Sequence, residues 1–135
     1  MVDIESGKAY SKDEIEENFD YGFGFQIRGI NRVTNENGDL DSIIVFSNND
    51  GPYDDDINGS KFTYWGELQN GDYETAYNKG LIRSMVEDIP VHFFYKEESG
   101  DEWSYLGEVK VVGVNRDQDR DGRTNYKFEF EQKQK

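Results

Sequence analysis

Two tyrosines and a run of aspartates lie close together near the middle of the chain, in the stretch GPYDDDINGSKFTYWGE. Tyr53 precedes Asp54 to Asp56, and Tyr64 follows on a β-branched and aromatic run that is typical of a strand. Two flat rings can stack on the faces of one nucleobase, and a carboxylate can accept a hydrogen bond from its exocyclic amine. The stretch is therefore a candidate pocket for one extruded base. The alternative interpretation is an ordinary strand tyrosine next to a solvated acidic turn.

The length and composition indicate one domain over residues 1–135. Aromatic residues make up 15% of the chain while the hydrophobic fraction is only 34%, so much of the core must be Tyr and Phe. There is no cysteine, which excludes disulfides and thiolate metal sites. The N-terminus lacks an apolar leader and no apolar run is long enough to cross a membrane, so we expect a soluble, cytoplasmic domain.

The net charge of −14 disfavours indiscriminate binding to a polyanion, because phosphate binding depends on clustered Lys and Arg. Two stretches combine positive charge with an absence of acidic residues. Residues 25–33 contain Arg28 and Arg32, and residues 76–86 contain Lys79 and Arg83. We expect these stretches to lie together beside the pocket, to form the only electropositive surface and to contact the DNA backbone; the alternative is that they only add solubility.

The elements that must position these residues are two short helices and about six strands. A capping box at Ser11 to Glu14 predicts a helix to Phe19, and a second helix is predicted over Asp72 to Asp88. Strands are predicted over residues 25–33, 42–46, 62–65, 91–95, 102–114 and 126–130. This pattern predicts an α+β protein whose strongly twisted sheet curls into a barrel or a tight sandwich.

The order of several motifs resembles the SRA (SET- and RING-associated) domain, a reader of modified cytosine in DNA. It resembles still more closely the SRA-like head domains of modification-dependent HNH restriction endonucleases. In chain order, the motifs that carry the resemblance are Gly51-Pro52-Tyr53-Asp54-Asp55-Asp56, Tyr64-Trp65-Gly66-Glu67, Gly71-Asp72-Tyr73, Asn78-Lys79-Gly80-Leu81, Pro90-Val91-His92-Phe93 and Tyr105-Leu106-Gly107-Glu108. The chain departs from the family at Trp65 and Tyr73, and the segment between Gly66 and Asp72 is too short for the long finger loop of the eukaryotic readers.

The resemblance implies a PUA/SRA-like β-barrel that flips a 5-methyl- or 5-hydroxymethylcytosine into the pocket. Tyr53 and Tyr64 would stack on the base, and Asp56 would accept from its exocyclic amine, with Asp54 as the second choice for that role. The same resemblance assigns further residues to the pocket lining, Ser47, Asn48 and Glu67, and to its structural support, Gly66 and Asn78.

The resemblance also implies a binding domain without catalysis or cofactor of its own, which serves as the sensor of a modification-dependent restriction system. An HNH-type nuclease domain or subunit is the candidate partner. An HNH site needs several histidines, and His92 is the only histidine of the chain. Glu108 and Lys110 match half of a metal-dependent nuclease motif, but an exposed edge strand explains them equally. The rival hypothesis is a small-ligand or protein-interaction domain on the same barrel, without nucleic-acid binding, which the acidic charge would explain.

A run of aspartates near the C-terminus matches the start of a calcium-binding loop. Asp117, Asp119, Asp121 and Gly122 have the spacing D-x-D-x-D-G, but the twelfth position is Phe128 instead of a bidentate Glu. A calcium-stabilised structural domain is therefore a third hypothesis, against a solvated hairpin loop.

Overall fold

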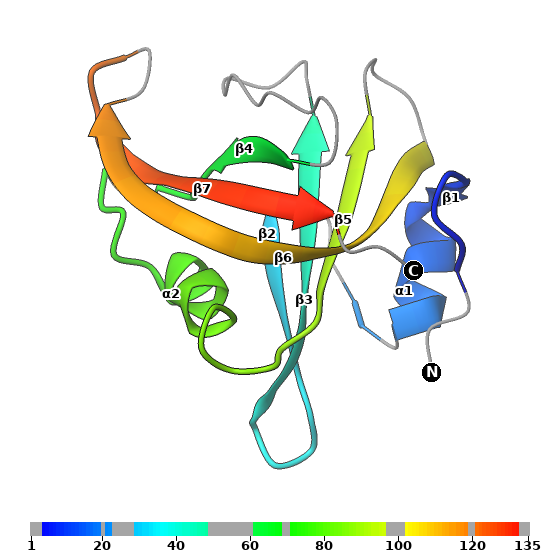
Figure 1. Ribbon diagram of the computed structural model, residues 1–135. Coiled ribbons are helices and arrows are strands. Elements are labelled where there is room, and N and C mark those ends of the chain that lie inside the picture. Colours follow the sequence, from blue (N-terminus) through cyan, green and yellow to red (C-terminus); the bar gives the residue numbers. More distant parts are fainter. Residues whose placement is uncertain are drawn as a thin grey trace.

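The structure is a computed structural model that describes residues 4–19, 21–22, 29–48, 61–68, 71–96, 102–118 and 121–132, with the side chains of Asn48 and Lys96 left out. This part of the chain forms two helices and seven strands (Figure 1). In chain order they are β1 Ala9–Ser11, α1 Lys12–Phe19, β2 Ile30–Thr34, β3 Leu40–Asn48, β4 Lys61–Trp65, α2 Ala76–Arg83, β5 Val91–Lys96, β6 Glu102–Gln118 and β7 Thr124–Gln132.

All seven strands belong to one mixed sheet with the order β2-β3-β5-β6-β7-β4, and β1 pairs with β6. The β3–β5 pair is parallel and the others are antiparallel. Strand β6 curves across the molecule and carries β7 and β4 back over the other strands (Figure 1). The terminal strands β2 and β4 do not pair with each other within the described residues. The α+β class, the curled sheet and the two helices are thus confirmed, but the expected barrel is corrected to a sheet that is not closed.

The aromatic core lies on both faces of the central strands. On β3 and β5, Val45 and Phe93 belong to one buried cluster and Ile44 and Phe94 to another. Strands covered on both faces carry continuous apolar runs instead of alternating ones. This explains the unbroken apolar pattern that predicted these two strands.

Helix α1 begins as the sequence predicted. The Ser11 hydroxyl accepts from the Glu14 amide at 3.2 Å, and the Glu14 carboxylate accepts from the Ser11 amide at 3.0 Å. Ile15 and Phe19 are buried against the sheet. Strand β1, directly before the helix, was missed because three residues are too few to show a periodic pattern.

Helix α2 is shorter than the predicted span from Asp72 to Asp88. Its N-cap is Thr75, whose side chain accepts from the amide of Asn78 at 3.1 Å. The carboxylate of Asp72 accepts from the Glu74 amide at 2.9 Å, so it closes a turn ahead of the helix instead of capping it. The helix ends at Arg83 because the chain continues in turns from Ser84.

Two smaller expectations concern β5 and β6. His92 is buried, with its Nδ1 atom 2.7 Å from the Tyr105 hydroxyl and its ring 4.8 Å from that of Phe19, so the interpretation as a packed core histidine is confirmed. Burial raises the pKa of Tyr105 to about 12. Strand β6 changes neighbours at Val109. Among the described residues Glu108 pairs with His92 of β5 and Lys110 with Glu131 of β7, so each of them is paired along one edge of β6.

Candidate functional site

Several predicted site residues lie outside the described residues. They are Tyr53, Asp54, Asp56 and Arg28, and the side chain of Asn48. The slot between the two tyrosine rings therefore stays a prediction from the sequence. The described part of the site consists of Tyr64, the end of β3, and the segment that follows β4.

Tyr64 is a buried residue of β4, with 7% of its surface exposed. Its hydroxyl donates to the carbonyl of Phe46 on β3 at 3.0 Å. Its ring stacks on Phe130 at 5.7 Å with a tilt of 22°, and Phe93 meets it edge-on at 5.9 Å. A β-carbon on Gly29 would lie 2.8 Å from the Tyr64 hydroxyl oxygen, so only glycine leaves room for this contact. Tyr64 therefore joins β4 to β3 across the curled sheet, and its stacking on a base stays a prediction.

Ser47 follows Phe46 on β3 and is also buried. It pairs with Tyr95 near the end of the parallel strand β5. The ends of β3 and β5 point in the same direction (Figure 1), and the hydrogen bond of Tyr64 ties β4 to this end. The structure thus brings Ser47 and Tyr64, which are distant in the sequence, to the same region of the fold.

The segment after β4 is held by a fully buried amide. The Oδ1 atom of Asn78 accepts from the amide of Glu67 at 2.8 Å. Its Nδ2 group donates to the carbonyls of Glu67 and Tyr73, each at 2.8 Å. One side chain of α2 thereby fixes the backbone three residues beyond Tyr64. Its contribution to a base pocket stays a prediction.

A second buried side-chain amide, on strand β7 instead of helix α2, holds the same segment. Asn125 on β7 donates to the carbonyl of Gly66 at 2.7 Å, and the Gly66 amide donates to the carbonyl of Tyr126 at 2.8 Å. Sequence reasoning missed Asn125, because its partner is 59 residues away and a polar residue early in a strand gives no signal of burial.

We expect Gly66→Ala to lower the free energy of unfolding by about 1–3 kcal/mol, the usual cost of overpacking a well-packed site. A β-carbon on Gly66 would lie 2.7 Å from the Oδ1 atom of Asn78, so the two hydrogen bonds to Glu67 would have to shift. The matched control is Gly113→Ala, whose β-carbon would make an ordinary 3.7 Å contact with Glu129. Urea denaturation measures both; equal effects at the two positions would contradict this account.

The two cationic stretches adjoin in their described parts, as expected. A β-carbon on Gly80 of α2 would lie 3.7 Å from the Nε atom of Arg32 on β2. Acidic neighbours nevertheless pair with the cations of α2. Lys79 lies 3.9 Å from Glu74, and Arg83 contacts both carboxylate oxygens of Glu87, at 2.5 and 3.0 Å.

These ion pairs arise from residues just outside the acid-free stretch. The hydrogen bond from Arg83 holds the pKa of Glu87 below its ordinary value, so the carboxylate stays charged beside the guanidinium. The expected electropositive surface is therefore partly neutralised. Contacts of Arg28, Arg32, Lys79 and Arg83 with a DNA backbone stay predictions.

The calcium candidates flank the turn between β6 and β7. The carboxylate of Asp117 accepts from the amide of Gln118 at 2.8 Å, and Asp121 lies 3.3 Å from the guanidinium of Arg123. Asp119 lies outside the described residues. Within the part of the chain that the structure describes, no group of three His, Cys, Asp or Glu residues is placed to hold a metal ion.

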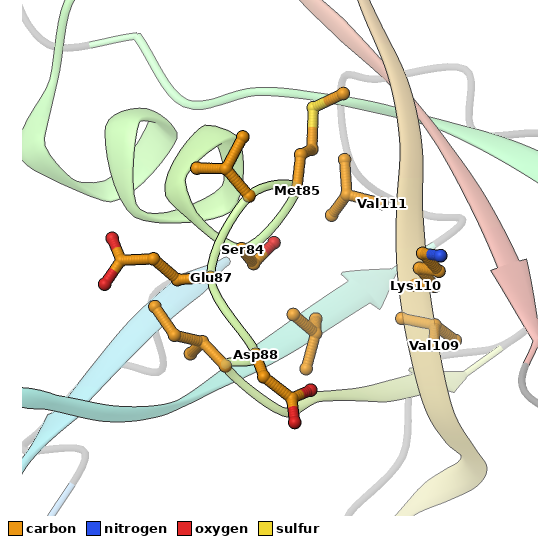
Figure 2. A pocket seen from close by; sticks show the side chains of 10 residues that line it. Ser84, Met85, Glu87, Asp88, Val109, Lys110 and Val111 are labelled. Atoms are coloured by element: carbon orange, nitrogen blue, oxygen red, sulfur yellow. The ribbon is translucent and has the colours of Figure 1, made fainter.

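A cavity of about 280 Å³ lies between the chain after α2 and strand β6. Figure 2 shows Met85 next to Val111 at one end, with Glu87 and Asp88 on the side away from Lys110. None of the predicted pocket residues lines this cavity, so it is separate from the site around Tyr64. Among the described helices, none is long and apolar enough to cross a membrane.

Comparison with solved structures shows SRA domains with the same fold. The SUVH5 SRA domain in complex with methylated CHH DNA matches with a TM-score of 0.74 and 20% identity, over 98% of this chain and 90% of that one. The SUVH5 SRA domain bound to fully hydroxymethylated CG DNA matches with a TM-score of 0.74 and 18% identity, over 98% and 91%. Arabidopsis thaliana SUVH6 matches with a TM-score of 0.72 and 20% identity, over 98% of this chain and 26% of that one.

Comparison with the curated proteins gave no match. The sequence family described as "ScoMcrA-like, SRA domain" matches residues 6–132, which is nearly the whole chain. The curled sheet with its two helices is thus an SRA fold. The chain belongs to the ScoMcrA-like SRA domain family.

Proposed function

We propose that this domain binds DNA by flipping a modified cytosine, of the 5-methyl or 5-hydroxymethyl type, into a pocket formed by Tyr53, Tyr64 and Asp56. The observation that carries the proposal is the family match over residues 6–132. It is supported by the shared fold of SRA domains solved with methylated and with hydroxymethylated DNA.

The described residues support the proposal through the rigidity of the site. Tyr64 is fixed by a hydrogen bond to β3 and by two aromatic neighbours, and Asn78 fixes the segment that follows. A ring held in one orientation binds a base without a further loss of side-chain entropy. Stacking contributes about 1–3 kcal/mol per base, which can offset the few kcal/mol needed to unstack it.

The corresponding biological role is recognition in a modification-dependent restriction system. In this role the domain binds and does not cleave, and an HNH-type nuclease, fused or separate, cuts the DNA in the cytoplasm. Co-purification of the chain with such a nuclease, or a fused nuclease domain in its gene, would support this part of the proposal.

The test is a fluorescence-anisotropy titration with three duplexes of one sequence that carry cytosine, 5-methylcytosine or 5-hydroxymethylcytosine at one site. We expect tighter binding to at least one modified duplex at every salt concentration, since base discrimination does not depend on counterion release. Equal affinity for all three duplexes would overturn the proposal.

The second candidate is a small-ligand or protein-interaction domain without nucleic-acid binding. The net charge of −14 and the ion pairs of Lys79 and Arg83 favour it. Absence of binding to all three duplexes at low salt, where phosphate attraction is strongest, would favour this candidate over the reader.

A further inference from the structure

Positive charge is concentrated in one segment near the C-terminus. Of the 15 Lys and Arg residues of the chain, five lie between residues 110 and 127: Lys110, Arg116, Arg120, Arg123 and Lys127. The same segment holds three acidic residues, Asp117, Asp119 and Asp121, so its net charge is 5 − 3 = +2 in a chain of −14. These aspartates are the calcium candidates of the sequence, and Arg116, Arg120 and Arg123 lie beside or between them.

In the described part of this segment, β6 and β7 form a two-stranded ribbon that extends beyond the rest of the sheet. Strands β6 and β7 stay paired as far as Gln118 and Thr124. Strand β5 pairs with β6 no further than Val109, and β4 pairs with β7 no further than Lys127. The strands from Asn115 to Gln118 and from Thr124 to Tyr126 therefore extend past the last residues that pair with β5 and β4 (Figure 1, orange and red).

The base of this ribbon is attached to the candidate site. Asn125 and Tyr126 form two hydrogen bonds with the backbone of Gly66, two residues after Tyr64. Tyr126 also donates to the carboxylate of Glu74, and this hydrogen bond raises the pKa of Tyr126 to about 12. The ribbon is thus anchored to Gly66, directly after β4, and to Glu74, just before α2.

The cations of the ribbon are exposed or are held by weak contacts. Arg116 is exposed, and its described contact is with the Tyr73 hydroxyl at 3.5 Å. Arg123 is paired with Asp121 at 3.3 Å, and their side chains are 44% and 70% exposed. Exposed ion pairs contribute little to stability, so Arg123 can exchange its carboxylate for a phosphate at little cost.

The cations also lie on both faces of the ribbon. Directly opposed residues of an antiparallel pair point to the same face. Arg116 is opposite Tyr126, while Lys127 is opposite Asn115 on the other face, with its amine 5.1 Å from the centre of the Trp65 ring. A two-stranded ribbon fits within the major groove of B-DNA, where cations on its two faces meet the phosphates of both strands.

We propose that the β6–β7 ribbon is the phosphate-contacting arm of the DNA interface, with Arg116 and Arg123 on the DNA backbone. The proposal rests on the proposed function. It identifies the segment from which a strongly acidic domain obtains its phosphate contacts. It assigns this role to a segment outside the two cationic stretches predicted from the sequence.

The test compares the double variant Arg116→Gln/Arg123→Gln with the charge-matched double variant Lys8→Gln/Lys12→Gln. Lys8 directly precedes β1, and Lys12 is the first residue of α1. Affinity for the 5-methylcytosine duplex and for the plain duplex is measured as a function of salt concentration. Each phosphate contact contributes roughly 0.9 to the slope of log K against log salt. In the Arg116→Gln/Arg123→Gln variant, the magnitude of this slope should therefore decrease by about 2. Its affinity near 0.1 M salt should fall roughly 50-fold for both duplexes.

The control variant should keep a slope close to that of the wild type, although its net charge changes equally. Arg116→Lys/Arg123→Lys keeps the charge and should restore most of the affinity, and thermal melting confirms that each variant is folded. Equal losses in the arm and control variants, or no loss in the arm variant, would overturn the arm while leaving discrimination by the wild type intact. Binding of the wild type to all duplexes with equal, arm-dependent affinity supports the arm and overturns only the reader. No binding to DNA overturns both.

Discussion

Asn78→Ala is expected to lower the free energy of unfolding by about 3 kcal/mol. The substitution leaves the amide and carbonyl of Glu67 and the carbonyl of Tyr73 without their buried partner. Loss of a partner costs about 1–3 kcal/mol for each group that water cannot reach, and Glu67 is only partly buried, so a total near the lower end of the range for three groups is expected. Urea denaturation with an unchanged m-value measures the effect.

A matched control separates this effect from the general cost of losing an asparagine in a helix. Asn18 on α1 donates to the Glu14 carbonyl at 2.8 Å in an exposed position, so Asn18→Ala should change stability by less than about 0.5 kcal/mol. Asn78→Asp should be at least as damaging as Asn78→Ala, because a carboxylate would face two carbonyl oxygens. A neutral effect of Asn78→Ala would show that α2 does not hold the segment after β4.

The elements that were predicted correctly are those with local signals. The capping box of α1 lies within four residues of the sequence, and its two hydrogen bonds form as predicted. The apolar runs of β3 and β5 predicted that both faces of these strands are buried, and this prediction does not depend on which elements cover the faces. The family resemblance assigned Gly66 and Asn78 to the structural support of the pocket. The structure shows Asn78 bonded to the backbone of Glu67, and the support of a base pocket stays a prediction.

The features that were missed depend on contacts between distant residues. Asn125 gave no signal, since its partner Gly66 lies on another strand. The start of α2 was misplaced because Thr75 and Asp72 are both good capping residues, and only the folded chain decides which one caps the helix. A curled sheet and a closed barrel have the same strand pattern, so the sequence could not distinguish between them.

Charge was the least predictable property of the surface. The stretch from Ala76 to Val86 has no acidic residue, yet Arg83 pairs with Glu87 one helical turn later. The β6–β7 segment contains three aspartates, yet its exposed Arg116 contacts the Tyr73 hydroxyl, and the carboxylate that acts on it is Glu74, from the segment before α2. An absence of acidic residues along the sequence is therefore a poor guide to where a polyanion can bind.

Asp56→Ala is expected to remove discrimination between modified and plain DNA. In the proposed pocket Asp56 accepts a hydrogen bond from the exocyclic amine of the flipped cytosine. A hydrogen bond to a charged group contributes about 1.5–3 kcal/mol, which corresponds to a loss of roughly 10- to 150-fold in affinity for the modified duplex. Affinity for the plain duplex should stay unchanged, since non-specific binding depends on phosphate contacts and not on the pocket.

Asp54→Ala is the matched control, because it removes the same charge two residues away. If phosphate repulsion by the acidic run limited binding, both variants would bind every duplex more tightly, and by the same factor. If Asp56 recognises the base, its replacement alone weakens binding, and Asp56→Asn, which keeps one acceptor oxygen without the charge, has an intermediate affinity. A larger loss in Asp54→Ala would transfer the role to Asp54, the second choice for it. Retained discrimination in both variants would show that the carboxylates of this run do not bind the base.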